Sequence, residues 1–342
     1  VCVRGGWFRV IACSCVSGGG EARVYPAANH FVGHWIPAHG VGVANGWIFA
    51  GVGAGAGLSP PLITYFMLRY GWRSSFWACA IIGLVAGAVW YLTARDEPSE
   101  HPRVSASELA TIQAGLPAKT ESKGSGLVPW GTVLRSREVW AVTLSYFSFG
   151  YVAWIFFSWF FIYLAQVRGL DLKASAFYAM LPPIAMSVCS LLGGGINDRL
   201  TKRHSPRLGR CGLAAFGLAV AGIFIAFGSQ VDSARLASVV LAGGAGALYL
   251  AQSSYWSVTA DIAGKSSGSV SGFMNMGAQI GGAVTASLTP AIAARFGWTA
   301  SFLVAAGLCV LGAAAWLVVD PTKVLLPTAP SDTRLVIAQD TN

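Results

Sequence analysis

Glu21 is the only carboxylate that lies inside an apolar stretch of this chain. The other acidic residues, thirteen of 14, lie in connecting segments, at the ends of apolar stretches or in the tail. Tyr25 and Asn29 follow Glu21 at i+4 and i+8, so a helix would place all three side chains on one face. An ionisable group at membrane depth is costly, and its default interpretation is functional. These residues therefore predict a protonatable site, provided that the stretch lies in a membrane.

The composition indicates that the stretch around Glu21 lies in a membrane. Of the 342 residues, 54% are hydrophobic and only 11% are charged, whereas soluble domains have about 25% charged residues. The 42 glycines fall mostly inside apolar runs, which suits closely packed membrane helices. The formal net charge of +9 is carried by loops between those runs. The cytoplasmic face of a membrane explains these cations better than a nucleic-acid partner does.

Nine charge-poor intervals have about the 20 residues that a bilayer-crossing helix needs. They cover roughly residues 8–33, 40–68, 74–94, 139–167, 174–197, 211–231, 236–260, 266–294 and 296–319. Alternate loops hold fourteen and six basic residues, so the positive-inside rule places the richer set and the C-terminus in the cytoplasm. We expect a multi-pass protein of the inner (cytoplasmic) cell membrane, with the lipid bilayer as its partner.

An internal repeat explains the odd number of spans. The sequence GWRSSF at 71–76 recurs as GWTASF at 297–302, an offset of 226 residues. The second copy belongs to a six-span half that starts near Val139, so we expect two such halves and twelve spans, of which this chain carries the last nine. The expected parts are an atypical N-terminal segment (1–17), three helices of the first half (8–94), a cytoplasmic linker (95–138), the second half (139–320) and a cytoplasmic tail (321–342). In the linker, Ser105 and Glu108 form a capping-box pattern that predicts a short helix up to Gly115.

Two six-span halves joined by a cytoplasmic loop resemble the major facilitator superfamily. The sequence GGINDR at 194–199, with Lys202 and Arg203, is similar to the G-x-x-x-D-R-x-x-[KR]-[KR] loop of that superfamily. Further motifs resemble the anion:cation symporter family, which includes galactonate, glucarate and hexuronate transporters. They are GEA at 20–22, YPAAN at 25–29, WIP at 35–37, the linker at 95–112, Asp261 and GSVSGFMN at 268–275. Residues 1–17 do not share the likeness, and Ser14 stands where related transporters carry arginine.

The resemblance implies an all-α polytopic protein with the major facilitator fold and about nine of its twelve transmembrane helices. It implies symport of a small organic anion, such as a sugar acid, with a proton or sodium ion by alternating access. Glu21 would carry the coupling proton. The residues implied in substrate binding are Asn29, Tyr151, Trp154, Ser253, Trp256 and Asn275. Structural alternatives stay open, because Glu21 could pair with Arg23, and the aromatic and polar side chains could serve helix packing.

A cytoplasmic latch is predicted from Asp198 with Arg199 and Arg203, the alternative being simple positive-inside topology. Catalysis finds little support, and we expect neither a cofactor nor a metal. His30, His34 and His39 lie near one predicted loop, but no carboxylate or cysteine completes metal-ligand spacing. We expect a monomer that is a transporter rather than an enzyme. The alternative is a truncated, non-transporting remnant of such a transporter.

Overall fold

The computed structural model describes residues 7–21, 24–37, 40–116 and 128–325. Every regular element in these ranges is helical, which confirms the all-α prediction. The first group of helices is α1 (Trp7–Glu21), α2 (Val24–Trp35), α3 (Val41–Tyr70) and α4 (Trp72–Thr93). Two short α-helices lie in the linker, α5 (Ala106–Gly115) and α6 (Trp130–Arg135), after a single 3-10 turn at Pro98–Glu100. The remaining helices are α7 (Arg137–Ser158), α8 (Phe160–Ile162), α9 (Leu172–Ala179), α10 (Leu181–Arg203), α11 (Leu213–Gln230), α12 (Ala234–Leu250), α13 (Gln252–Ala263), α14 (Ser267–Phe296) and α15 (Trp298–Ala315).

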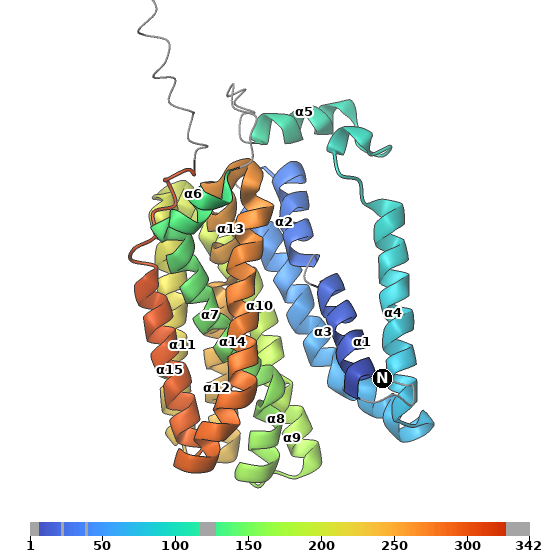
Figure 1. Cartoon of the computed structure of the whole chain (residues 1–342), viewed down its shortest axis with the longest axis vertical. Helices are drawn as coiled ribbons and strands as arrows, with labels where there is room; N and C mark the ends of the chain where they lie inside the picture. Colours follow the sequence, from blue (N-terminus) through green and yellow to red (C-terminus); the bar gives the residue numbers. More distant parts are fainter. Residues whose placement is uncertain (1–6, 22–23, 38–39, 117–127, 326–342) are drawn as a thin grey trace, which may run out of the picture.

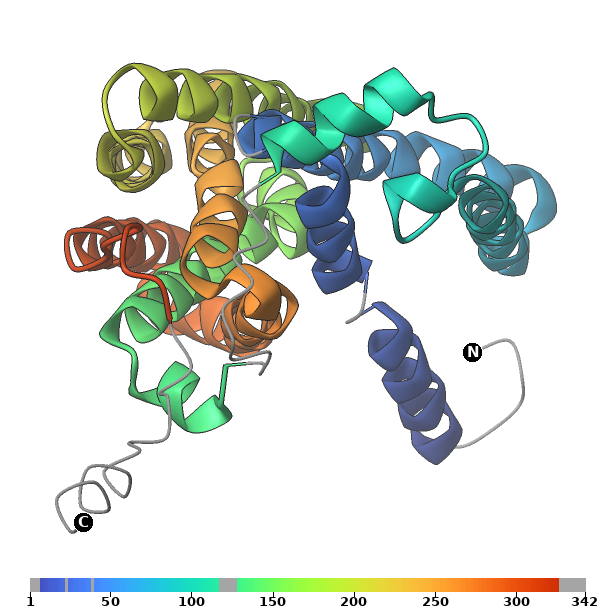
Figure 2. The ribbon, with the colours of Figure 1, turned by 90° about the horizontal axis from the view of Figure 1, so that it is seen from above.

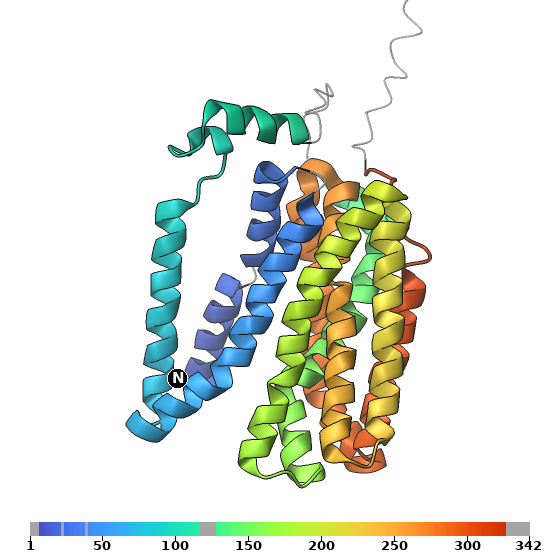
Figure 3. The ribbon, with the colours of Figure 1, turned by 180° about the vertical axis from the view of Figure 1, so that it is seen from behind.

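The helices form two unequal groups (Figure 1). Helices α7 to α15 make a bundle in which α7 packs along α14 and α11 packs between α12 and α15. Leu218, Ile225 and Leu241 lie fully buried between these last helices. The first group joins the bundle through α3, which packs along α10, and through α2, which packs on α14 (Figure 3). Helix α4 contacts α3 and stands apart from the bundle, with only Ser75 buried.

The linker covers one end of α2 (Figure 2). The indole N–H of Trp35 donates to the carbonyl oxygen of Arg95 at 3.0 Å, and its ring meets His101 edge-on. Helix α5 starts after Ser105, whose side chain accepts from the backbone N–H of Glu108 at 3.2 Å. A side-chain oxygen in this position satisfies one of the free donors at a helix start. The predicted linker helix is therefore confirmed.

The sequence repeat is also visible in the backbone. Gly71 and Gly297 both have positive φ, +83° and +85°, and each separates two long helices. Glycine has no Cβ and adopts this conformation without strain. The hydroxyl of Ser75 donates to the carbonyl of Ile63, and that of Ser301 donates to Thr289, so each bond reaches back 12 residues. Both pairs keep the offset of 226, so the two copies make the same helix-to-helix connection.

Seven helical segments among the described residues are long and apolar enough to cross a membrane. They match seven of the nine predicted spans. The first predicted span contains two helices, α1 and α2, each of them too short by itself. The eighth predicted span corresponds to α14, which has 30 residues and is long enough, but its serines, threonines and glycines lower its hydropathy. The chain is a multi-pass membrane protein with the expected helix order.

Candidate functional site

An aromatic cluster joins the two groups of helices, with Trp256 of α13 at its centre. The Trp256 side chain is 1% exposed. Its ring lies 5.9 Å from that of Tyr25 on α2 and 5.6 Å from that of Phe49 on α3, and the last two rings stack on each other. Aromatic pairs at such distances contribute roughly 0.5–1.5 kcal/mol beyond the area that they bury. Residues far apart in sequence thus meet at the contact between the two groups.

Tyr146 of α7 orients this tryptophan from the other side. Its hydroxyl oxygen accepts a hydrogen bond from Nε2 of Gln252 at 2.9 Å and one from Nε1 of Trp256 at 3.3 Å. Tyr255 packs on Tyr146 and bonds to Ser145 at 2.7 Å. The sequence places these groups on two apolar spans, but only the packing of α7 against α13 shows that they form one network.

The predicted substrate residues do not all lie at this cluster. Ser253 and Trp256 share α13, and Asn275 lies buried on α14, 7% exposed. Tyr151 bonds instead to Thr289 of α14 at 3.2 Å. Trp154 is 40% exposed and packs over the backbone at Gly282. Tyr151 and Trp154 therefore lie at the contact between α7 and α14, and their role in substrate binding stays a prediction.

Two further predicted residues lie in the first group. Asn29 belongs to α2, and Glu21 is the last residue of α1. Their side chains lie outside the described part of the structure, as do Ala22 and Arg23 between the two helices. Their roles stay predictions from the sequence.

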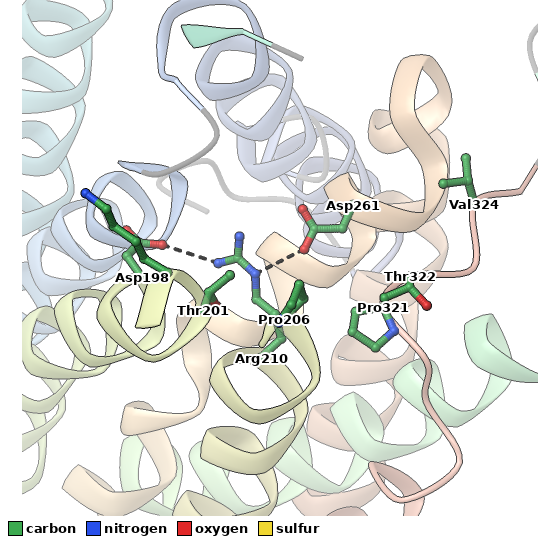
Figure 4. Close-up of a pocket in the computed structure, with 9 residues that line it drawn as sticks. Asp198, Thr201, Pro206, Arg210, Asp261, Pro321, Thr322 and Val324 are labelled. Carbon is green, nitrogen blue, oxygen red and sulfur yellow. Dashed lines mark hydrogen bonds and ion pairs between the residues drawn. The ribbon is translucent and has the colours of Figure 1, made fainter. Parts of the chain in front are cut away.

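A second polar cluster lies at the end of the bundle near the linker (Figure 4). Arg210 is 3% exposed and lies between two carboxylates. Its guanidinium pairs with Asp198 at 3.3 Å and with Asp261 at 3.0 Å, and it also donates to the amide oxygen of Asn197. Buried charges need such pairing, because an unpaired one would lose its hydration without compensation.

Asp198 also connects the two groups of helices. Its carboxylate accepts the backbone N–H groups of Gly42 at 3.0 Å and Val43 at 2.8 Å, in the first turn of α3. Helix α3 has no side-chain cap of its own. The first N–H groups of a helix have no partner within it and carry partial positive charge, so a carboxylate there is favourable. Asp198 therefore caps a helix of the other group.

The structure corrects which cation pairs with Asp198 in the predicted cytoplasmic latch. Asp198 occupies the expected position, but its partner is Arg210 rather than Arg199 or Arg203. The latter two lie close to Asp198 in sequence, and Arg203 is exposed. Arg210 lies in a short π-helix, Arg207–Gly212, that leads from α10 into α11, and the turn before it returns Arg210 to Asp198. Sequence spacing alone could not choose between these cations.

A pocket of about 550 Å³ opens beside this ionic cluster. The segment after α15 forms one wall through Pro321, Thr322 and Val324 (Figure 4). The backbone N–H of Leu325 donates to the carbonyl of Ile262 at 2.7 Å, which holds the segment against the end of α13. Among the described residues, no group of three histidine, cysteine or acidic side chains could hold a metal ion.

These features define a polytopic helical transporter with a polar cluster between two groups of membrane-spanning helices. The chain belongs to the major facilitator superfamily, whose family model matches residues 2–286 and 211–339. This is a family of transporters, not of enzymes.

The curated relatives include anion transporters. The chain is 30% identical over 308 residues to a probable sulfoacetate transporter of Cupriavidus necator, covering 90% of this chain and 71% of that protein. It is 26% identical over 319 residues to the hexuronate transporter of Bacillus subtilis, covering 91% and 72%. A chloroplastic ascorbate transporter of Arabidopsis thaliana is 27% identical over 302 residues, but the chain spans only 54% of its length. The resemblance to anion:cation symporters is therefore confirmed.

Proposed function

We propose that the protein carries a small organic anion, in the class of sugar acids and sulfoacetate, across the cytoplasmic membrane together with a proton. The observation that carries the proposal is the contact of Trp256 in the second group with Tyr25 and Phe49 in the first. A transporter binds its substrate between two bodies that rock against each other. A cluster at this contact can touch substrate from both bodies at once.

The ionic cluster supports the same mechanism. The Asp198 carboxylate holds the start of α3 through two backbone N–H groups, across the contact between the groups. These bonds stabilise the arrangement in which the two groups are closed at this end. Opening the end would require the bonds to break, so Asp198 biases the equilibrium between two states of the transporter.

Counterflow in proteoliposomes tests the proposed function. The full chain is reconstituted with an excess of unlabelled glucuronate, galactonate, glucarate or sulfoacetate inside, and entry of the same labelled anion is followed. We expect transient accumulation of at least one of the four. The proposal is contradicted if none accumulates above protein-free liposomes while circular dichroism shows that the reconstituted protein is helical.

Glu21→Gln tests the coupling role. Glutamine keeps the size of the side chain but cannot release a proton, so uphill uptake driven by a proton gradient should fall to the level of empty liposomes. Counterflow needs no net proton movement and should persist. Uptake after a pH step into liposomes without internal anion measures the first activity, and entry into liposomes with an unlabelled internal pool and no pH step measures the second. Unchanged uphill uptake by Glu21→Gln would remove Glu21 from coupling.

A further inference from the structure

Four buried polar atoms on helices α3 and α13 have no hydrogen-bond partner in the described part of the chain. They are Nδ2 of Asn45, Oε1 of Gln252, Oγ of Ser253 and Oγ of Ser257. All four residues are at most 2% exposed. An unpartnered buried polar group costs about 1–3 kcal/mol. Asn45 on α3 and the two serines on the facing helix α13 thus mark a place where another molecule can supply hydrogen bonds.

The periodicity of α13 shows which way its serines face. Successive helical residues turn by about 100°. With Ser254 set at 0°, the side chains point around the axis of α13 at about 200° for Trp256, 260° for Ser253 and 300° for Ser257. Ser254 bonds to Asn197 of α10, and Trp256 contacts Phe49 of α3. Ser253 and Ser257 therefore point between these two directions, toward the contact of α3 with α10.

The same counting on α3 places Asn45. With Gly42 set at 0°, the residues point around the axis of α3 at about 40° for Gly46, 340° for Phe49 and 300° for Asn45. Gly42 and Gly46 face α10, since a Cβ at Gly46 would lie 2.9 Å from the carbonyl oxygen of Ser190. Phe49 faces Trp256 of α13. Asn45 lies on the same face of α3 as Phe49, one helical turn nearer the start of the helix. Its amide therefore faces the contact between α3 and α13.

We propose that Asn45 and Ser257 join Ser253, which the family resemblance already implies in substrate binding, to form a neutral subsite that binds hydroxyl groups of the transported acid. The proposal rests on the proposed function and names the substrate feature that this part of the site recognises. A serine hydroxyl can donate and accept, and an amide nitrogen donates. A sugar hydroxyl also donates and accepts, so the three groups complement it. The subsite has no charged member, and a desolvated carboxylate here would lack the pairing that a buried charge needs.

Asn45→Ala and Ser257→Ala test the subsite by isothermal titration calorimetry on the purified full chain in detergent. Each variant should bind glucuronate, galactonate or glucarate roughly 3- to 10-fold more weakly than the wild type, the factor for one neutral hydrogen bond. Sulfoacetate has two acid groups and no hydroxyl. It should bind each variant as it binds the wild type, whether that binding is tight or below detection.

Thermal unfolding without ligand distinguishes a binding role from a structural one. Removing a polar atom that has no partner should leave the unfolding midpoint of the free protein unchanged or raise it. Ser190→Ala is the matched control, because Ser190 is also fully buried at the α3–α10 contact but its hydroxyl donates to the carbonyl of Gly46 at 3.2 Å. That variant should lower the midpoint and leave the affinities unchanged.

The outcomes separate this inference from the proposed function. If the folded wild type neither binds nor exchanges any of the four anions, the proposed function fails, and the subsite fails with it. If the wild type binds a hydroxylated acid and both variants bind it equally well, only the subsite is overturned. Equal losses for sulfoacetate and the hydroxylated acids would also overturn it, because the groups would then not be recognising hydroxyls.

Discussion

Replacing Arg210 by methionine is expected to destabilise the protein by about 3 kcal/mol, the lower end of the cost of breaking a buried ion pair. Arg210 is 3% exposed and is the cation shared by Asp198 and Asp261. Without it, two carboxylates face each other at the end of the bundle. The Asp198 side chain is 8% exposed, so water screens it little, whereas Asp261 is 34% exposed and recovers part of its hydration. Because only one of the two carboxylates stays shielded from water, the expected loss of stability lies at the lower end of the range for a broken buried ion pair.

The loss should appear as a lower thermal unfolding midpoint in detergent and as slower counterflow. Arg207→Met is the matched control, since Arg207 lies three residues earlier, is exposed and belongs to none of the ion pairs found among the described residues. Adding Asp261→Asn to the Arg210 variant removes one of the two facing charges and should restore part of the stability. If Arg210→Met and Arg207→Met unfold at the same temperature, the ionic cluster does not stabilise this end of the bundle.

The scarcity of charged residues over about 20 positions was sufficient to place most of the helices. The predicted spans at 40–68 and 74–94 correspond to α3 and α4, and that at 266–294 corresponds to α14. An apolar run of about 20 residues has few alternatives to a membrane helix, because its backbone groups must be satisfied internally. The GW repeat was equally informative, since glycine at 71 and 297 permits the positive φ that both connections use.

The site was less predictable because its contacts depend on packing between distant segments. Trp256 was a candidate from the sequence, but its neighbours Phe49 and Tyr146 lie about 207 and 110 residues earlier. The unpartnered amide of Asn45 was not a candidate at all, since an asparagine in a glycine-rich span has no distinguishing spacing. Long-range contacts of this kind come from helix packing, which the order of residues along one helix does not define.

The close contact of α3 with α10 leads to the second large effect, expected for Gly194→Ala. A Cβ at Gly194 would overlap the carbonyl oxygen of Gly42 and lie 3.2 Å from the Cα of Val43. These are backbone atoms and cannot move aside as a flexible side chain can, so the two helices must separate. Overpacking of this kind costs about 1–3 kcal/mol. Separation would also draw Asp198 away from the N–H groups of Gly42 and Val43.

Gly195→Ala, one residue along the same helix, is the control that isolates this contact. A Cβ at Gly195 meets nothing within 4 Å, and alanine is favoured over glycine in a helix by roughly 1 kcal/mol. The Gly195 variant should therefore match or exceed the wild type in thermal stability, while the Gly194 variant falls below it. Spin labels on cysteines placed at the exposed positions Val43 and Ile196 would report the separation as a longer distance between the two labels. Equal stability and equal label distances in the two variants would show that α3 tolerates a Cβ at Gly194, and that Asp198 does not depend on this close approach to hold the two groups together.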